Sequence, residues 1–193
     1  IAKIFVSGGE FVNFNPANCM AEGKPTNFLT SGYGVTKTSS DRDTTYAVIL
    51  TATAVSEVVV PANNATEVKY YYASLEEAFK QASEESTAEN CVTINVLKDC
   101  NGNGIVVREN SNICVNFNDH TYTMDGSTVG STNTKTQAFQ LLKDSDILFK
   151  NGKLVTVKNP ECKMLIQNYC NLTLDNMLID GENIVAGGYT MSN

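Results

Sequence analysis

The sequence predicts an all-β protein in which short strands wind into stacked coils, a solenoid, together with one α-helix. Three observations lead to this class. The 193 residues include 22 Asn, 20 Thr and 13 Gly; Asn tolerates positive φ at turns, and Thr suits strands. Short apolar alternations with a period of two recur along the chain. After a single helical segment, an apolar pattern returns at intervals near ~25 residues, inside the range of stacked structural repeats.

Residues 1–50 are expected to be rich in strands. One strand is predicted where apolar residues alternate at Ala2, Ile4 and Val6, and another at residues 46–50. A turn is predicted at Asn15-Pro16, because both residue types favour turns.

Residues 51–72 are expected to be a junction. They hold the apolar run 58–60, a break at Pro61, and a predicted turn at Asn63-Asn64.

One helix is predicted at residues 74–86. Ser74 and Glu77 form the S-x-x-E capping box, which satisfies free backbone N–H groups at a helix start. Four apolar residues follow the i, i+3, i+4, i+7 rule and make one stripe: Leu75, Ala78, Phe79 and Ala82. We therefore expect this helix to pack its stripe on an apolar surface and to expose its other side to water.

After the helix, short apolar alternations are separated by Asn, Asp and Gly, as is typical of short strands. A weak repeat runs through them, since residues 112–118 can be laid over 146–152 and over 171–176. In this alignment Ile113, Ile147 and Leu172 coincide. The first interval is longer because it contains the polar stretch 126–137, which we expect to be a loop inserted in one coil.

The interval of ~25 residues fits one turn of a coil. If each unit of ~25 residues makes one turn, its strands lie about 4.8 Å above those of the previous turn. Asn residues at matching corners can then hydrogen-bond along the stack, and the helix at 74–86 covers the open end of the first coil. An antiparallel β-sandwich would also show many short strands. It predicts neither the repeat nor a helix directly before it, so we favour the solenoid.

Three segments carry a resemblance to a known class. The helix start SLEEA (74–78), then VTINVLKD (92–99) and VNFNDHTYT (115–123), resemble the opening of right-handed parallel β-helices of the pectin-lyase-like class, with Asp119 where Gly is usual. Residues 7–16 (SGGEFVNFNP) resemble a motif that closes β-helices in repetitive proteins of gut bacteria and their phages, with Glu10 in place of Thr.

The resemblance implies a right-handed parallel β-helix and an order of parts. Residues 1–50 would be the C-terminal end of a preceding β-helix module, 51–72 the junction, and 73–193 the capping helix and first coils of a second module. The pattern is open at both Ile1 and Asn193. We therefore expect a processed piece or an ordered fragment of a longer chain.

Pectin-lyase-like folds include polysaccharide lyases and glycoside hydrolases, so an enzyme is an alternative. Hydrolases need paired carboxylates that flank one bond, and lyases that resemble this class need Ca²⁺-binding acids with an Arg or Lys base. Asp144 and Asp146 share a face if both lie in a strand, but we interpret them as marking the turn before Ile147. In Asn118-Asp119-His120 we interpret His120 as a turn residue.

Four aspartates are candidates for a Ca²⁺ site on neighbouring coils: Asp119, Asp125, Asp144 and Asp175. We favour solvated turn residues for these positions. The six cysteines permit up to three disulfides, but we favour buried free thiols, and zinc has little support with one His and no C-x-x-C. The sequons at 64–66 and 171–173 match the N-glycosylation pattern, as expected by chance in a chain rich in Asn and Thr. We predict no catalytic, cofactor-binding or metal-binding residues and no cofactor.

The balance of 14 basic and 21 acidic side chains, a net charge of −7, argues against a nucleic-acid partner. No apolar run approaches the ~18 residues of a membrane span.

The predicted β-helix and the resemblance favour a non-enzymatic structural or adhesive fibre module, extracellular, on a virion or cell surface. The expected partners are further copies, with a trimer favoured, and a host glycan. The resemblance favours a phage head or tail fibre over a bacterial adhesin. The alternatives are a fragment of a lyase or hydrolase, and a structural spacer without a ligand.

Overall fold

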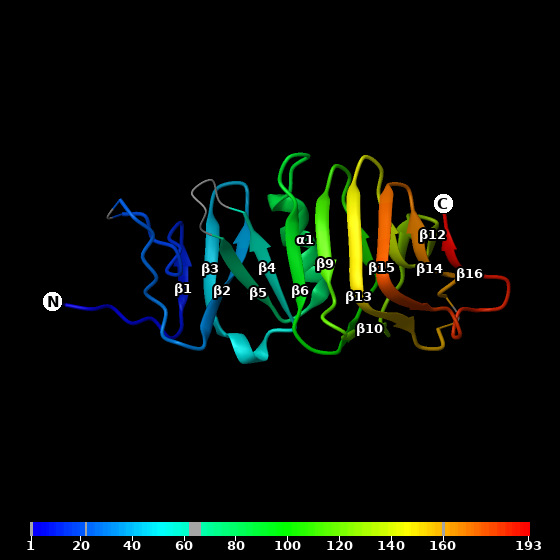
Figure 1. The fold of residues 1–193 in the computed structure, drawn as a ribbon, viewed down its shortest axis with the longest axis horizontal. Helices are drawn as coiled ribbons and strands as arrows, with labels where there is room; N and C mark the ends of the chain where they lie inside the picture. Colours follow the sequence, from blue (N-terminus) through cyan, green and yellow to red (C-terminus); the bar gives the residue numbers. More distant parts are fainter. Residues whose placement is uncertain (1, 22, 62–66, 160) are drawn as a thin grey trace.

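The computed structural model describes residues 2–21, 23–61, 67–159 and 161–193. Within these residues the chain is mostly β, with one α-helix and one short 3-10 helix. The molecule is elongated, and most strands run across its long axis (Figure 1). They are arranged side by side along that axis, between the N-terminal end and the C-terminal end. The predicted all-β class with one helix is therefore confirmed.

In chain order, the elements are β1 (Glu10–Val12), β2 (Tyr33–Ser39), β3 (Thr44–Leu50), η1 (Thr51–Thr53), β4 (Ser56–Val60), β5 (Val68–Tyr72), α1 (Leu75–Glu85), β6 (Val92–Val96), β7 (Cys100–Gly102), β8 (Ile105–Val107), β9 (Asn112–Asn116), β10 (Thr121–Met124), β11 (Val129–Ser131), β12 (Thr134–Leu141), β13 (Asp146–Thr156), β14 (Met164–Asn168), β15 (Asn171–Asp180) and β16 (Tyr189–Ser192).

The N-terminal region forms a three-stranded antiparallel sheet in the order β1-β3-β2. The strand predicted at 46–50 is confirmed as part of β3, and the turn after Asn15 is confirmed by its Oδ1, which accepts the N–H of Ala17 at 2.9 Å. The strand predicted at residues 2–6 is wrong: only Val6 forms a bridge, to Leu29. The alternating side chains there have no apolar face to cover, and Ile4 stays 64% exposed.

The segment 51–72, predicted as a junction, holds the antiparallel hairpin β4–β5. Strand β4 also pairs with β6, so this hairpin begins the eight-stranded sheet that continues into the rest of the chain. The run 58–60 lies in β4. The predicted turn at Asn63-Asn64 and the sequon at 64–66 fall on residues outside the described part.

Beyond α1 the ladders are mostly parallel. Strands β6, β9, β13 and β15 pair in parallel, as do β7, β10 and the second half of β13, and β8, β12, β14 and β16. With the antiparallel pairs of β4, β5 and β11, the sheets are mixed. The repeat alignment is confirmed by register, because Ile113 pairs with Ile147 and Ile147 with Leu172.

The inserted stretch 126–137 is not simply a loop, which corrects the prediction. Strand β11 folds back antiparallel on β12 with a bulge between Val129 and Gly130, so much of the insertion forms a β-hairpin. Its polar side chains give no apolar alternation, and the backbone pairing alone defines these strands.

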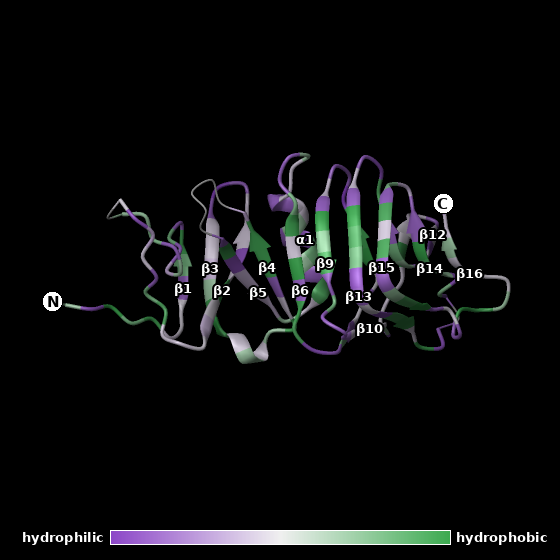
Figure 2. Ribbon diagram, in the orientation of Figure 1, coloured by the Kyte–Doolittle hydropathy of each residue, from purple (hydrophilic) through white to green (hydrophobic). Residues whose placement is uncertain are grey.

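The core lies between the sheets and beneath α1. Four buried aromatic rings meet there edge to face, with centroids 5.7–6.1 Å apart: Phe79, Phe117, Phe139 and Phe149. This is the geometry that aromatic pairs prefer. Figure 2 shows the apolar stretches concentrated along the strands and the polar residues at many of the bends.

Helix α1 confirms its predicted start and stripe. Ser74 is the N-cap, and its Oγ accepts the backbone N–H of Glu77 at 3.2 Å. Leu75, Ala78, Phe79 and Ala82 are each at most 1% exposed, and the helix packs on β4, β6 and β8. The helix thus covers the apolar interior where the parallel ladders begin.

Asparagine ladders join successive strands, as predicted. Asn151 donates from Nδ2 to Oδ1 of Asn116 at 3.3 Å, and Asn176 donates to Oδ1 of Asn151 at 3.2 Å. Asn118, Asn151 and Asn176 all have positive φ, between 49° and 55°, which Asn tolerates better than most residues. Asn151 and Asn176 therefore each shape a corner and donate to the preceding asparagine of the ladder, whereas Asn118 shapes its corner and donates to the Val96 carbonyl.

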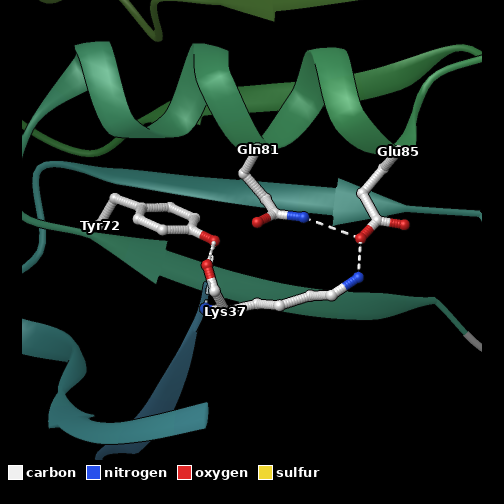
Figure 3. A network of polar contacts seen from close by, with 4 residues as sticks. All are labelled: Lys37, Tyr72, Gln81 and Glu85. Carbon is white, nitrogen blue, oxygen red and sulfur yellow. Dashed lines mark hydrogen bonds and ion pairs between the residues drawn. The ribbon is translucent and has the colours of Figure 1, made fainter. Parts of the chain in front are cut away.

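A polar network ties the N-terminal sheet to the helix (Figure 3). Lys37 of β2 pairs with Glu85 of α1, which also accepts from Gln81 Nε2 at 2.7 Å. The hydroxyl of Tyr72 donates to the Lys37 carbonyl at 3.0 Å. Because these side chains are largely covered, the contacts hold the two regions together.

No helix in the described part of the chain is long and apolar enough to cross a membrane.

Candidate functional site

The two aspartates that could form a hydrolytic pair do not lie side by side on one strand face. Asp144 has φ 59° at an exposed bend, and Asp146 is the first residue of β13. Asp146 accepts a hydrogen bond from Asn171 Nδ2 at 3.0 Å, which joins β13 to β15. The interpretation of the pair as marking the turn before Ile147 is confirmed for Asp144 and wrong for Asp146, which already pairs in the sheet.

His120 follows a tight turn directly before β10. Its N–H donates to the carbonyl of Phe117 at 2.8 Å, and the two central residues, Asn118 and Asp119, have φ of 49° and 65°. Positive φ at both positions is the signature of a type I′ turn, in which Gly is the usual alternative to Asn or Asp. The interpretation of His120 as a turn residue is confirmed, and its ring contacts Asp99 at 3.3 Å.

The four candidate Ca²⁺ ligands do not come together. Asp119 and Asp144 lie in different turns, Asp125 follows β10, and Asp175 lies within β15. Across residues 2–21, 23–61, 67–159 and 161–193, no three His, Cys, Asp or Glu side chains are grouped so that they could hold a metal ion. All six cysteines are free thiols, but the expectation that they are buried is wrong for five of them: only Cys162 is buried, Cys91 is exposed, and the other four are partly exposed.

The structure instead brings polar side chains together on one sheet surface, which we call the polar face. It is the solvent side of β7, β10, β13 and β15, where the residues that alternate with buried Tyr122 and Met124 point outward. Its members are Asp99, Asn101, Thr121, Thr123, Asp125, Lys153 and Asp180. Two shallow hollows lie on it, and Thr121 lines both.

Contacts between neighbouring strands organise the polar face. Lys153 Nζ of β13 lies 3.0 Å from Asp180 Oδ2 of β15. Asn101 donates to the carboxylate of Asp125, and Asp99 accepts the backbone N–H of Thr121 at 2.9 Å. These bonds fix side-chain positions along the surface before any ligand arrives.

Two carboxylates of this face, those of Asp99 and Asp180, are stabilised in the ionised form. The backbone N–H of Thr121, assisted by His120, holds the pKa of Asp99 below its usual value. The N–H of Glu182 and the side chain of Lys153 lower the pKa of Asp180 in the same way. A hydrogen bond to the charged form is the common cause. The face therefore offers fixed negative acceptors beside the hydroxyls of Thr121 and Thr123.

The carboxylate and hydroxyl oxygens of this face determine which hydrogen bonds it can form. An ionised carboxylate only accepts hydrogen bonds, whereas a hydroxyl both donates and accepts them. Both aspartates with a shifted pKa on this face are held in the ionised form.

Sequence reasoning missed Lys153 and Asp180. Their pairing depends on the bend at Asn151-Gly152, beyond which β13 stops pairing with β9 and pairs with β10. The available signal was the same repeat that aligned Ile147 with Leu172, because continuing it past the bend places Lys153 beside Leu178. No protein-family model, curated protein or solved structure matches this sequence.

Proposed function

We propose that residues 73–193 are the capping helix and first coils of a right-handed parallel β-helix, with 51–72 as a junction after the end of a preceding module at 1–50. Support comes from three sets of parallel pairs that advance together, one strand per winding. Ile113, Ile147 and Leu172 make one column, and Phe139 and Ile166 belong to another. Right-handed crossovers are the rule for parallel strands.

This module is a structural and adhesive fibre element, extracellular and on a virion or cell surface. A stack of parallel strands adds length with few special residues and keeps its backbone hydrogen-bonded throughout. The observation that carries the adhesive role is the polar face, where outward side-chain oxygens near β7, β10 and β15 flank the ammonium group of Lys153 on β13. Its ligand is a neutral glycan, because the ionised Asp99 and Asp180 repel anionic sugars.

The fibre is homo-oligomeric, with a trimer as the favoured form. The support is a pair of apolar side chains on one face of β16 that stay about half exposed or more: Tyr189 at 64% and Met191 at 49%. Such exposed apolar groups are typical of contact surfaces. Light scattering is expected to give three times the chain mass of 20.9 kDa; a monomer at all concentrations would refute the trimer.

A glycan array tests the adhesive role. Thr123→Val removes one hydroxyl from the polar face and keeps a β-branched strand residue, so binding of a neutral glycan should fall at least fivefold. Thr38→Val makes the same change on exposed β2, away from this face, and should leave binding unchanged. Equal binding by wild type and Thr123→Val would contradict the proposal, as would a preference for acidic glycans.

The second candidate is a polysaccharide lyase or hydrolase fragment. The observation in its favour is the Lys153–Asp180 pair on adjacent strands beside a hollow. A depolymerisation assay on acidic polysaccharides, with and without Ca²⁺, tests it. Turnover that disappears in Lys153→Met or Asp144→Ala would establish the enzyme and displace the fibre role; no turnover in any variant is the result we expect.

A further inference from the structure

A cavity of about 370 Å³ lies where the N-terminal segment crosses β2 and β5. Tyr33 and Tyr71 line it beside the polar side chains of Asn18, Thr26 and Asn27. Its volume falls in the range of small-ligand sites, about 300–1,000 Å³. None of the lining residues belongs to the polar face, so this is a separate place on the molecule.

The Tyr71 wall of the cavity is held rigid. Its hydroxyl donates to Glu57 Oε1 at 2.9 Å, and the same carboxylate accepts from Lys69 Nζ and Asn95 Nδ2, both at 3.1 Å. Glu57 is 9% exposed. Beneath the ring lies Gly34, where any Cβ would collide with Tyr71. A ring fixed before binding loses little entropy when a ligand packs on it.

The cavity lining offers hydrogen-bond donors but carries no net positive charge. Asn27 Oδ1 accepts the N–H of Leu29 at 2.8 Å, which leaves its Nδ2 group as a donor. The charge of Lys69 is balanced by Glu57, and Glu67 adds a carboxylate at the lining that has no cationic partner among the described residues. An anionic ligand would therefore meet net negative charge.

We propose that this cavity binds a single neutral pyranose ring. The faces of Tyr33 and Tyr71 contact its C–H surface, and the Asn27 amide and Lys69 ammonium donate to its hydroxyls. This inference rests on the proposed function, since it gives the fibre a second place for a glycan, a terminal sugar rather than a chain. It differs from the polar face in using aromatic rings, which that face lacks.

The test titrates the 193-residue chain with the methyl glycosides of glucose, galactose, mannose and N-acetylglucosamine and measures binding by ligand-observed NMR. At least one should bind with a Kd near ~1 mM, as expected for so small a ligand. Tyr33→Ala should weaken that binding at least tenfold. The matched control is Tyr169→Ala, an exposed tyrosine between β14 and β15, which should bind like wild type.

A milder variant keeps the test decisive if Tyr33→Ala unfolds. Asn27 is exposed, so Asn27→Ala should fold and weaken binding about threefold. Absence of binding by all four glycosides overturns the proposal, as does tighter binding of methyl glucuronide than of methyl glucoside. Absence of glycoside binding by the wild-type chain, together with array binding that is lost in Thr123→Val, refutes this cavity and leaves the proposed function standing.

Discussion

The asparagine ladder gives the most direct test of how the stack is held together. Asn151 sits in the middle of it, with φ 55° and one side-chain hydrogen bond to each neighbouring strand. Replacement by Ala removes both bonds, each worth roughly 0.5–1.5 kcal/mol, and places a Cβ residue without a polar side chain at positive φ, a cost of about 1–2 kcal/mol. The free energy of unfolding should fall by about 2–5 kcal/mol.

Replacement of the same residue by Gly separates the two causes. Asn151→Gly loses the hydrogen bonds but accepts positive φ without strain, so it should cost about 1–3 kcal/mol, less than Asn151→Ala. Urea unfolding measured by circular dichroism gives both values from the midpoint and slope. The control is Asn133→Ala in the exposed β11–β12 turn, whose φ is not positive; its unfolding curve should match wild type.

Two results would refute this reasoning about the ladder. One is an unfolding free energy for Asn151→Ala within about 0.5 kcal/mol of wild type, the usual range of a neutral surface substitution. The other is an Asn151→Gly variant that is less stable than Asn151→Ala, since that order would mean that the left-handed backbone at the corner carries no cost.

Two further predictions concern the helix and the buried carboxylate. Phe79→Ala should lower the free energy of unfolding by about 3–5 kcal/mol, because the ring is fully buried among aromatic partners; Phe5→Ala, at a 73% exposed ring, should change it little, and equal effects in urea melts would contradict the assigned core. Burial alone would raise the pKa of Glu57, but hydrogen bonds from Asn95, Lys69 and Tyr71 outweigh it and lower that pKa. Its contribution is therefore fully present above the unfolded-state pKa of about 4.3 and is lost as pH falls through the lower folded-state pKa. Glu57→Gln should flatten the acid limb of a plot of urea midpoint against pH, and an unchanged acid limb would count against the assignment.

The parts of the fold that the sequence predicts correctly are those in which a local sequence pattern is enough to define the element or its register. Helix α1 has a capping box and an apolar stripe, and both are used as expected. The register of Ile113 on Ile147 on Leu172 follows from apolar alternation and from asparagines that accept positive φ at the corner. Slipping by one residue would turn every apolar side chain outward, so register is strongly specified there.

The parts that sequence reasoning misses depend on a partner strand. The central residues of β2 include Thr36, Lys37 and Thr38, which give no apolar period, yet the strand forms because β3 pairs along its whole length. The inserted hairpin β11–β12 is polar for the same reason. At residues 2–6 the opposite happens: a good alternation has no sheet face to cover, and Ile4 remains exposed. A strand is thus decided by its neighbour as much as by its own sequence.

The polar face extends this argument from fold to function. Lys153 and Asp180 are ordinary charged residues in the sequence, and nothing local distinguishes them from Lys150 or Asp175. Only at the bend after Asn151 does β13 change its partner from β9 to β10 within the eight-stranded sheet, and just beyond it Lys153 Nζ lies 3.0 Å from Asp180 Oδ2. Asn151 therefore has two roles. Its side-chain hydrogen bonds join neighbouring strands, and the bend at which it lies sets the positions of the side chains that follow it. For that reason Asn151→Ala should also weaken glycan binding on the polar face, and full binding by a folded Asn151→Ala variant would separate the two.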